Sequence, residues 1–173
     1  MRVNQLLLAV YLLVLATCQR DSAGALIPLD YASWSRTTTA ILDYPIPGHE
    51  DHFRLIYINP VGEGLDVKQE AGRTTHSYPQ GTVIVKEIYS ERSHRPGDIP
   101  AQLTVMIKDS DHPDARGGWL WVVRDVATGQ DTVFTGAFCV TCHDNANEEH
   151  PYGDRNPEAE FRDYVFFPYL RED

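Results

Sequence analysis

The chain is poor in cysteine, in methionine and in long apolar segments. Its 173 residues include three cysteines and two methionines. The longest uncharged apolar run covers residues 6–16, well short of the roughly twenty residues that a membrane-spanning helix needs. Internal repeats and low-complexity tracts are also missing, which excludes repeat architectures. The length fits one globular domain with a modest core.

The apolar run near the N-terminus predicts a secretory signal. Arg2 precedes it, and the polar segment that follows ends in the small residues Ala23-Gly24-Ala25, a pattern that signal peptidase cleaves. We expect residues 1–25 to be a signal peptide and residues 26–173 to form the mature domain. Cys18 resembles the lipid-attachment cysteine of a lipoprotein, so membrane anchoring through a lipid stays an alternative. Either way we expect a periplasmic or otherwise exported protein.

Acidic residues outnumber basic ones. The chain has 25 acidic and 15 basic side chains and a formal net charge of −10. A surface of this sign repels nucleic acid, whose phosphates are bound by lysine and arginine. It is compatible with solubility or with a basic redox partner protein.

A short helix is predicted near the start of the mature domain. Asp30 is a candidate N-cap. Trp34, Thr38 and Ile41 lie on one stripe of a helix that would cover residues 31–42. Two prolines soon follow and would end it.

Beyond this helix the apolar residues alternate with period two, and Pro-Gly and Gly-Gly pairs interrupt them. We therefore expect an α+β, β-rich fold with a mostly antiparallel sheet of about five strands and a few short helices. A polar stretch over residues 144–162 is expected to be a surface loop, and the aromatic segment 163–168 is expected to return to the core. The predicted strands cover residues 52–58, 82–89, 101–108, 119–124 and 132–135.

The strongest functional signal is the pentapeptide Cys139-Val-Thr-Cys-His143. Two thiols one helical turn apart can add to the two vinyl groups of a haem, which places the adjacent imidazole over the iron. We predict one covalently attached haem c, held by Cys139 and Cys142, with His143 as the iron ligand. A redox-active or structural disulfide is an alternative that leaves His143 unexplained, and a zinc site would need further cysteines.

The second axial position of the iron separates electron carriers from ligand-binding proteins. Apart from the initiator, Met106 is the only methionine, and it lies upstream of the haem motif on a predicted strand. The other histidines lie in or beside turn-like segments, where we expect surface exposure. We therefore predict a five-coordinate iron with one open face. The histidines concerned are His49, His52, His76, His94, His112 and His150.

Two basic residues share strand faces with apolar side chains. Lys86 alternates with isoleucines, while Glu87 points to the opposite face, so burial of either face turns a charged group inward. A buried lysine is costly unless it is paired or chemically used. The alternative is a Lys86 side chain that reaches solvent from a strand end. Arg54 also shares a face with isoleucines and is a candidate partner for a haem propionate or a bound ligand.

The motifs of the mature chain occur in the order seen in the cytochrome P-460 family, which the sequence resembles over nearly its whole mature length. The most specific elements are the stretch Pro79–Lys86 and the haem motif near the C-terminus. The resemblance implies a β-rich homodimer, related to cytochrome c′-beta, with a five-coordinate haem. The matching segments are Trp34, Phe53–Asn59, Tyr78–Glu87, Val105–Lys108, Gly117–Trp119, Cys139–His143 and Asp163–Phe166.

The same resemblance assigns roles to individual residues. In the name-giving members, which oxidise hydroxylamine, a lysine is covalently joined to the porphyrin, and Lys86 falls on that position. Arg54 matches an arginine of the distal pocket. Those members also carry a distal carboxylate where the register here puts Thr104, and such a general base commonly contributes about 10²–10⁴ in rate. The resemblance thus implies catalytic roles for Lys86 and Arg54, with the base missing.

Three functions stay open from the sequence. The first is a redox enzyme that oxidises hydroxylamine or a related small nitrogen species and passes electrons to a partner protein. The second is a haem protein of the cytochrome c′-beta type that binds or scavenges nitric oxide without turnover. The third, a periplasmic electron carrier, requires a sixth protein ligand to the iron.

Overall fold

The computed structural model describes residues 26–47, 52–91 and 98–169. A six-stranded antiparallel sheet, ordered β1-β2-β5-β6-β7-β8, dominates this part of the chain. The predicted signal peptide, including Cys18, lies outside the described residues. The strands are β1 Ser35–Arg36, β2 Phe53–Ile58, β3 Asp66–Glu70, β4 Arg73–Ser77, β5 Val83–Tyr89, β6 Gln102–Lys108, β7 Trp119–Asp125 and β8 Asp131–Val133.

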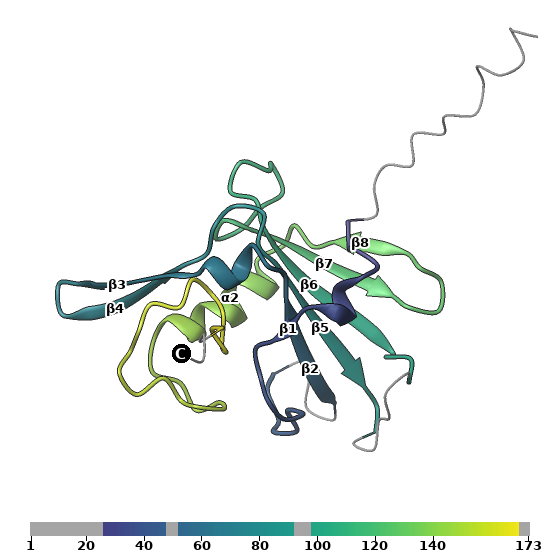
Figure 1. Cartoon of the computed structure of the whole chain (residues 1–173), viewed down its shortest axis with the longest axis horizontal. Coiled ribbons are helices and arrows are strands. Elements are labelled where there is room, and N and C mark those ends of the chain that lie inside the picture. The colour runs from purple at the N-terminus through teal and green to yellow at the C-terminus, as the bar shows by residue number, and fades with distance from the viewer. Residues whose placement is uncertain (1–25, 48–51, 92–97, 170–173) are drawn as a thin grey trace, which may run out of the picture.

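Short helices complete the fold: η1 Tyr31–Ser33, η2 Gly62–Gly64, α2 Phe138–Asp144 and η3 Asn145–Asn147. Figure 1 shows α2 and the yellow C-terminal segment on one side of the sheet, with the β3–β4 hairpin projecting away from it. Within the described ranges, no helix has the length and apolar character needed to cross a membrane.

The predicted β-rich architecture is confirmed. Each of the five predicted strands forms, with bounds within two residues of those expected from the alternation of apolar side chains. The period-two pattern was informative because each of these strands pairs antiparallel and presents alternate residues to opposite faces.

The helix predicted over residues 31–42 is wrong. Only the single 3-10 turn η1 forms, and Asp30 at its N-cap position makes no side-chain capping bond. The chain then becomes extended, and Ser35 pairs with Ile58 on the edge of β2. The backbone groups of β2 offer partners that an isolated short helix lacks, and tertiary pairing of this kind overrides a weak helical pattern.

Both faces of the sheet are buried. On one face, Val85 and Val105 belong to a cluster that the N-terminal segment covers through Ile27. On the other face, Ile84 and Trp121 belong to a cluster with residues of α2 and the C-terminal segment. Strands covered on both sides have apolar residues at nearly every position, as β5 does.

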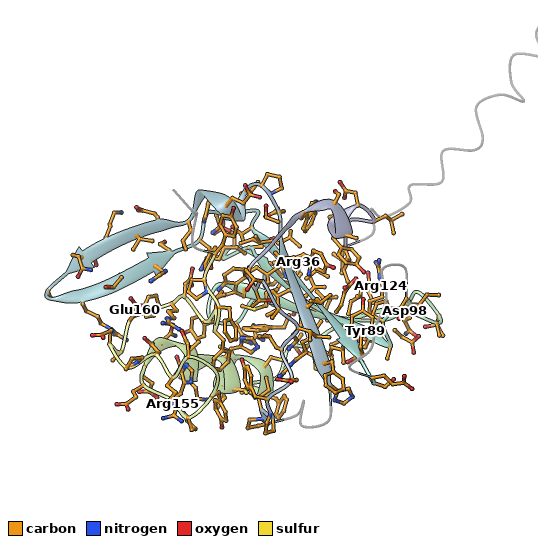
Figure 2. All side chains as sticks on the ribbon, turned by 60° about the horizontal axis from the view of Figure 1, so that its bottom comes forward. Arg36, Tyr89, Asp98, Arg124, Arg155 and Glu160 are labelled. Atoms are coloured by element: carbon orange, nitrogen blue, oxygen red, sulfur yellow. The ribbon has the colours of Figure 1, made fainter. Side chains whose placement is uncertain are left out.

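Because both faces are covered, Lys86 and Glu87 of β5 both point inward. Glu87 faces the N-terminal segment, is 5% exposed, and accepts hydrogen bonds from the hydroxyls of Tyr31 and Tyr89. Tyr89 and Arg124 lie at the end of the molecule away from Glu160 (Figure 2). The carboxylate of Glu87 thus connects the N-terminal segment, through Tyr31, to the sheet. Lys86 points to the opposite face.

Beyond the end of α2 and the 3-10 turn η3, the polar stretch over residues 144–162 is irregular, as predicted, but it is not wholly on the surface. The side chain of Asn156 is buried and donates to the carbonyl oxygens of Ala146 and Glu160. Arg162 is buried as well and pairs with Asp154 and Glu160. Asparagine and arginine can satisfy irregular backbone and carboxylates from within a loop, so a polar sequence here does not mean exposure.

Two histidines depart from the predicted surface exposure. His76 lies on β4 and is 3% exposed, and His150 is 5% exposed. His76 is covered because the chain around Phe161 folds over β4. The backbone nitrogen of His76 donates to the carbonyl oxygen of Phe161. His150 is covered by the rings of Tyr152 and Phe166. Contacts between segments distant in sequence cause both burials.

Burial of His76 predicts an acid-sensitive stability. Burial lowers its pKa below the ordinary 6.5, although Glu160 opposes the shift. The unfolded chain therefore binds a proton more readily than the folded chain, and the free energy of unfolding falls as pH drops below about 6.5. Denaturant unfolding measures this free energy at about pH 7 and about pH 5. Between these two pH values it should fall less in His76→Gln than in the wild type. In His112→Gln, which leaves His76 and Glu160 unchanged, the free energy of unfolding should fall as much as in the wild type. Equal falls in all three proteins would contradict the role of His76.

Candidate functional site

A cavity of about 260 Å³ lies between the sheet, α2 and the C-terminal segment. A single buried water needs about 10–15 Å³, so the cavity has room for a large organic group. Its lining is mainly apolar with a few polar side chains, as is usual for cofactor sites. All the predicted site residues line this one cavity: Arg54, Lys86, Cys139, Cys142 and His143.

Helix α2 presents the two cysteines to the cavity. Cys139 and Cys142 are separated by about one helical turn, and both are half-buried and free of a disulfide. Burial raises the pKa of both thiols, so they are protonated at neutral pH. Across the described residues, no group of three or more His, Cys, Asp or Glu side chains could hold a metal ion. Two half-buried thiols one helical turn apart, followed directly by a histidine, fit thioether attachment of a haem.

His143 is oriented by the backbone of the C-terminal segment. Its Nδ1 lies 2.9 Å from the carbonyl oxygen of Tyr164. A carbonyl only accepts hydrogen bonds, so Nδ1 carries the proton and Nε2 is the nitrogen with a lone pair for a metal. Burial, with a smaller contribution from the Lys86 charge, lowers the pKa of His143 to about 4. The imidazole is thus neutral at physiological pH, the form that binds a metal.

Two aromatic rings fix the plane of the His143 imidazole. The ring centroid of Trp121 lies 4.7 Å away and that of Phe166 lies 5.4 Å away. The indole of Trp121 is itself anchored, because its Nε1 donates to the carbonyl of Arg116. The imidazole is therefore held on one side by the sheet and on another by the C-terminal segment.

The register of the sheet orders the cavity side chains in rows. Trp121 lies opposite Met106 in the row against which His143 packs. The next row holds Lys86 opposite Thr104, and Arg54 lies one row further along β2. Rows on one face are about 6.6 Å apart, since each residue of a strand advances about 3.3 Å. The backbone positions of Lys86 and then Arg54 thus lie progressively further along the sheet from Trp121.

Lys86 lies in the middle of β5 between two neighbouring strands, not at an exposed strand end. Its side chain is partly accessible and lines the cavity. Burial, with a smaller contribution from the Arg54 charge, lowers the pKa of its amine to about 8. An appreciable fraction of this amine is neutral near neutral pH and can act as a nucleophile.

Arg54 is 1% exposed and lines the same cavity. Its guanidinium lies 4.9 Å from the ring centroid of Tyr44, and Nη2 donates to the Tyr44 carbonyl. Nε and Nη1 are buried and have no hydrogen-bond partner within the described part of the chain. Buried donors of this kind are costly when unmet, so the site fits an acceptor group, such as a carboxylate of a cofactor, placed in the cavity.

Thr104 lines the cavity and lies directly opposite Lys86 on the neighbouring strand. No aspartate or glutamate is among the described residues that form the cavity wall. The same wall contains a single histidine, His143, since His52, His76, His112 and His150 lie elsewhere. His49 and His94 fall outside the residues that the structure describes.

Several residues of the site were not found from the sequence. Tyr164 acts through its backbone carbonyl, which no side-chain pattern reveals. Tyr44 contacts Arg54 from a loop ten residues upstream. Trp121 and Phe166 were predicted to be in a strand and a core segment, but their contact with His143 depends on how those segments meet.

A comparison of the sequence with known families agrees with this geometry. The model of the family described as cytochrome P-460 matches residues 28–167, which include every residue of the cavity named above. No curated protein matches the chain. The chain belongs to the cytochrome P-460 family, whose cofactor is a haem.

Proposed function

We propose that this protein is an exported cytochrome with one covalently attached haem c that oxidises hydroxylamine or a related small nitrogen compound. The observation that carries the proposal is the convergence of Cys139, Cys142, His143 and Lys86 on one cavity. The bound haem supplies an iron that can coordinate the substrate and accept its electrons. The sequence supports export through the predicted signal peptide, residues 1–25. The redox partner and a homodimer are parts of the same proposal.

The attachment follows from the chemistry of α2. The protonated thiols of Cys139 and Cys142 would each add across one vinyl group of the haem. Each addition forms one thioether bond, two in all. His143 would then bind the iron through Nε2 while Nδ1 keeps its bond to Tyr164. A proximal histidine held in this way has a fixed ring and a fixed tautomer.

The side of the iron opposite His143 is proposed to stay open. Met106, the candidate sulfur ligand, lines the cavity but lies in the same row as Trp121, which packs against His143. The histidines other than His143 that the structure describes do not line the cavity. This arrangement supports ligand binding over simple electron carriage, which needs a second protein ligand to the iron.

Lys86 is proposed to be joined to the porphyrin ring by a carbon–nitrogen bond. This bond would replace one amine N–H and one ring C–H bond, and the two electrons and two protons would pass to an external oxidant such as hydrogen peroxide. It lies one row beyond Trp121, between the side that holds His143 and the row that holds Arg54. A Lys86→Met variant should keep the haem on Cys139 and Cys142, while its ferrous Soret band moves to shorter wavelength because the ring loses its substituent. Lys68→Met, at an exposed lysine of β3, is the control and should leave the spectrum unchanged. A wild-type spectrum identical to that of Lys86→Met would count against the link.

Arg54 is proposed to orient the substrate or a haem propionate. Its buried Nε and Nη1 can donate to an oxygen atom in the cavity, and the guanidinium stays charged although burial lowers its pKa. Protons released from hydroxylamine need an acceptor, and no described carboxylate lines the cavity. Solvent would then take these protons, and we expect slow turnover.

The lack of a carboxylate among the described residues of the cavity wall favours a second candidate function, the binding or scavenging of nitric oxide. Nitric oxide needs an open iron but no general base. Incubation of the purified haem protein with hydroxylamine and an artificial electron acceptor separates the two. Reduction of the acceptor that depends on hydroxylamine supports the oxidase. Tight nitric oxide binding with no acceptor reduction would overturn the enzymatic proposal in favour of the binding protein.

A further inference from the structure

Two residues of the family-like motifs lie outside the cavity and have no part in haem attachment. They are Lys108, at the end of β6, and Asp163, at the start of the C-terminal aromatic segment. Lys108 Nζ lies 2.7 and 2.8 Å from the two carboxylate oxygens of Asp163. The two side chains are 12% and 7% exposed. This is a partly desolvated, bidentate ion pair between segments 55 residues apart.

Asp163 is held by further groups. Its carboxylate accepts from the backbone nitrogen of Tyr78 at 3.1 Å, and its carbonyl accepts from Trp119 Nε1 at 3.0 Å. Lys108 Nζ also lies 4.9 Å from the centroid of the Trp119 ring. Groups from three separate parts of the sheet region therefore fix one residue of the C-terminal segment.

The backbone at this point adopts an unfavourable conformation. Asp163 has a φ of 49° and Tyr164 a φ of 68°, in the left-handed region that residues other than glycine seldom occupy. Such a conformation persists only where its surroundings enforce it. Asn147 also stabilises this backbone conformation, because its Oδ1 accepts a hydrogen bond from the backbone nitrogen of Tyr164 at 3.0 Å.

The consequence of this conformation is the direction of one carbonyl. Tyr164 immediately follows Asp163, and its carbonyl oxygen accepts the 2.9 Å hydrogen bond from His143 Nδ1. A shift of the Asp163–Tyr164 backbone would lengthen that bond. A carbonyl oxygen that accepts a hydrogen bond from the second ring nitrogen of a metal-binding imidazole raises the basicity of that imidazole and sets its orientation.

We propose that Lys108 and Asp163 are positioning residues that set the strength of the His143–Tyr164 hydrogen bond and, through it, the electron donation of His143 to the haem iron. The inference rests on one part of the proposed function, namely that His143 binds the haem iron. A weakened hydrogen bond makes the imidazole a poorer donor, which favours the ferrous state.

The test compares two methionine variants of the haem-loaded protein. Lys108→Met should lower the iron–histidine stretching frequency in the resonance Raman spectrum of the ferrous protein and raise the reduction potential of the haem. Arg124→Met removes a matched ion pair, with Asp131, whose side chains are 12% and 16% exposed. Arg124 lies far from the C-terminal loop in Figure 2. This control should lose thermal stability but keep the wild-type frequency and potential.

Two more variants keep the inference open to refutation if Lys108→Met folds poorly. Lys108→Arg retains the charge and should stay close to the wild type in both properties. Asp163→Asn retains the size of the side chain and should shift both in the same direction as Lys108→Met. Wild-type frequency and potential in Lys108→Met and Asp163→Asn, or equal shifts in Arg124→Met, would overturn the inference. A wild-type protein without an iron–histidine band would instead refute the proposed five-coordinate iron bound by His143, so the two failures are distinguishable.

Discussion

Replacement of His143 by glycine is expected to lower hydroxylamine turnover by more than about 100-fold while the haem stays attached to the protein. Loss of a residue that merely supports a metal ligand typically costs about 10–100-fold in metal affinity or activity, so loss of the ligand should cost more. Haem content is measured by the absorbance of its pyridine complex after denaturation, and turnover by reduction of an artificial acceptor.

The attached haem separates this result from a failure of maturation, because Cys139 and Cys142 are unchanged. Added imidazole should enter the space left by the missing side chain and restore part of the turnover. His112→Gln, a change outside the cavity, should behave as the wild type. Unchanged turnover in a His143→Gly protein that carries its haem would contradict the assignment of His143 as the axial ligand.

A Thr104→Glu variant is expected to raise hydroxylamine turnover. Thr104 lines the cavity beside Lys86, and a carboxylate there could accept the protons that the substrate releases. General bases commonly contribute about 10²–10⁴ in rate, and we expect an increase toward the lower end because a new carboxylate lacks evolved supporting contacts. The measurement is the initial rate with a saturating artificial acceptor.

Thr104→Gln provides the matched control, since glutamine has nearly the shape of glutamate but cannot act as a base. Its turnover should stay near that of the wild type. The gain in Thr104→Glu should also disappear at low pH, where the carboxylate is protonated. Equal gains in both variants would point to a steric effect and would remove the case for a missing base.

The fold was predictable where the sequence carries a local pattern. The main sheet was predictable because β2, β5, β6 and β7 are short runs rich in β-branched and aromatic residues, and turn residues separate them. The hairpin β3–β4 was missed, since β3 is exposed throughout and has no buried face to leave a period-two pattern. Its turn at Ala71 and Gly72, both with positive φ, contains no proline or asparagine that would have marked it.

The site was predictable as chemistry but not as geometry. The spacing of Cys139, Cys142 and His143 predicted one haem-binding unit, and the inward alternation of Lys86 predicted an unusual lysine. That both Lys86 and Glu87 point inward depends on the N-terminal segment covering the second face of the sheet, which the sequence of β5 alone does not reveal. The role of Tyr164 was out of reach, because a backbone carbonyl has no residue-type signature.

The central claim is that the cavity between the sheet and α2 holds one haem attached to Cys139 and Cys142 and linked to Lys86. A mass-spectrometric map of tryptic peptides tests it most directly in protein produced with haem-maturation machinery. Trypsin cuts after Arg124 and Arg155, so the account predicts that peptide 125–155 carries the haem and is joined to a peptide uncut at Lys86. Free or disulfide-bonded Cys139 and Cys142, without haem, would contradict it.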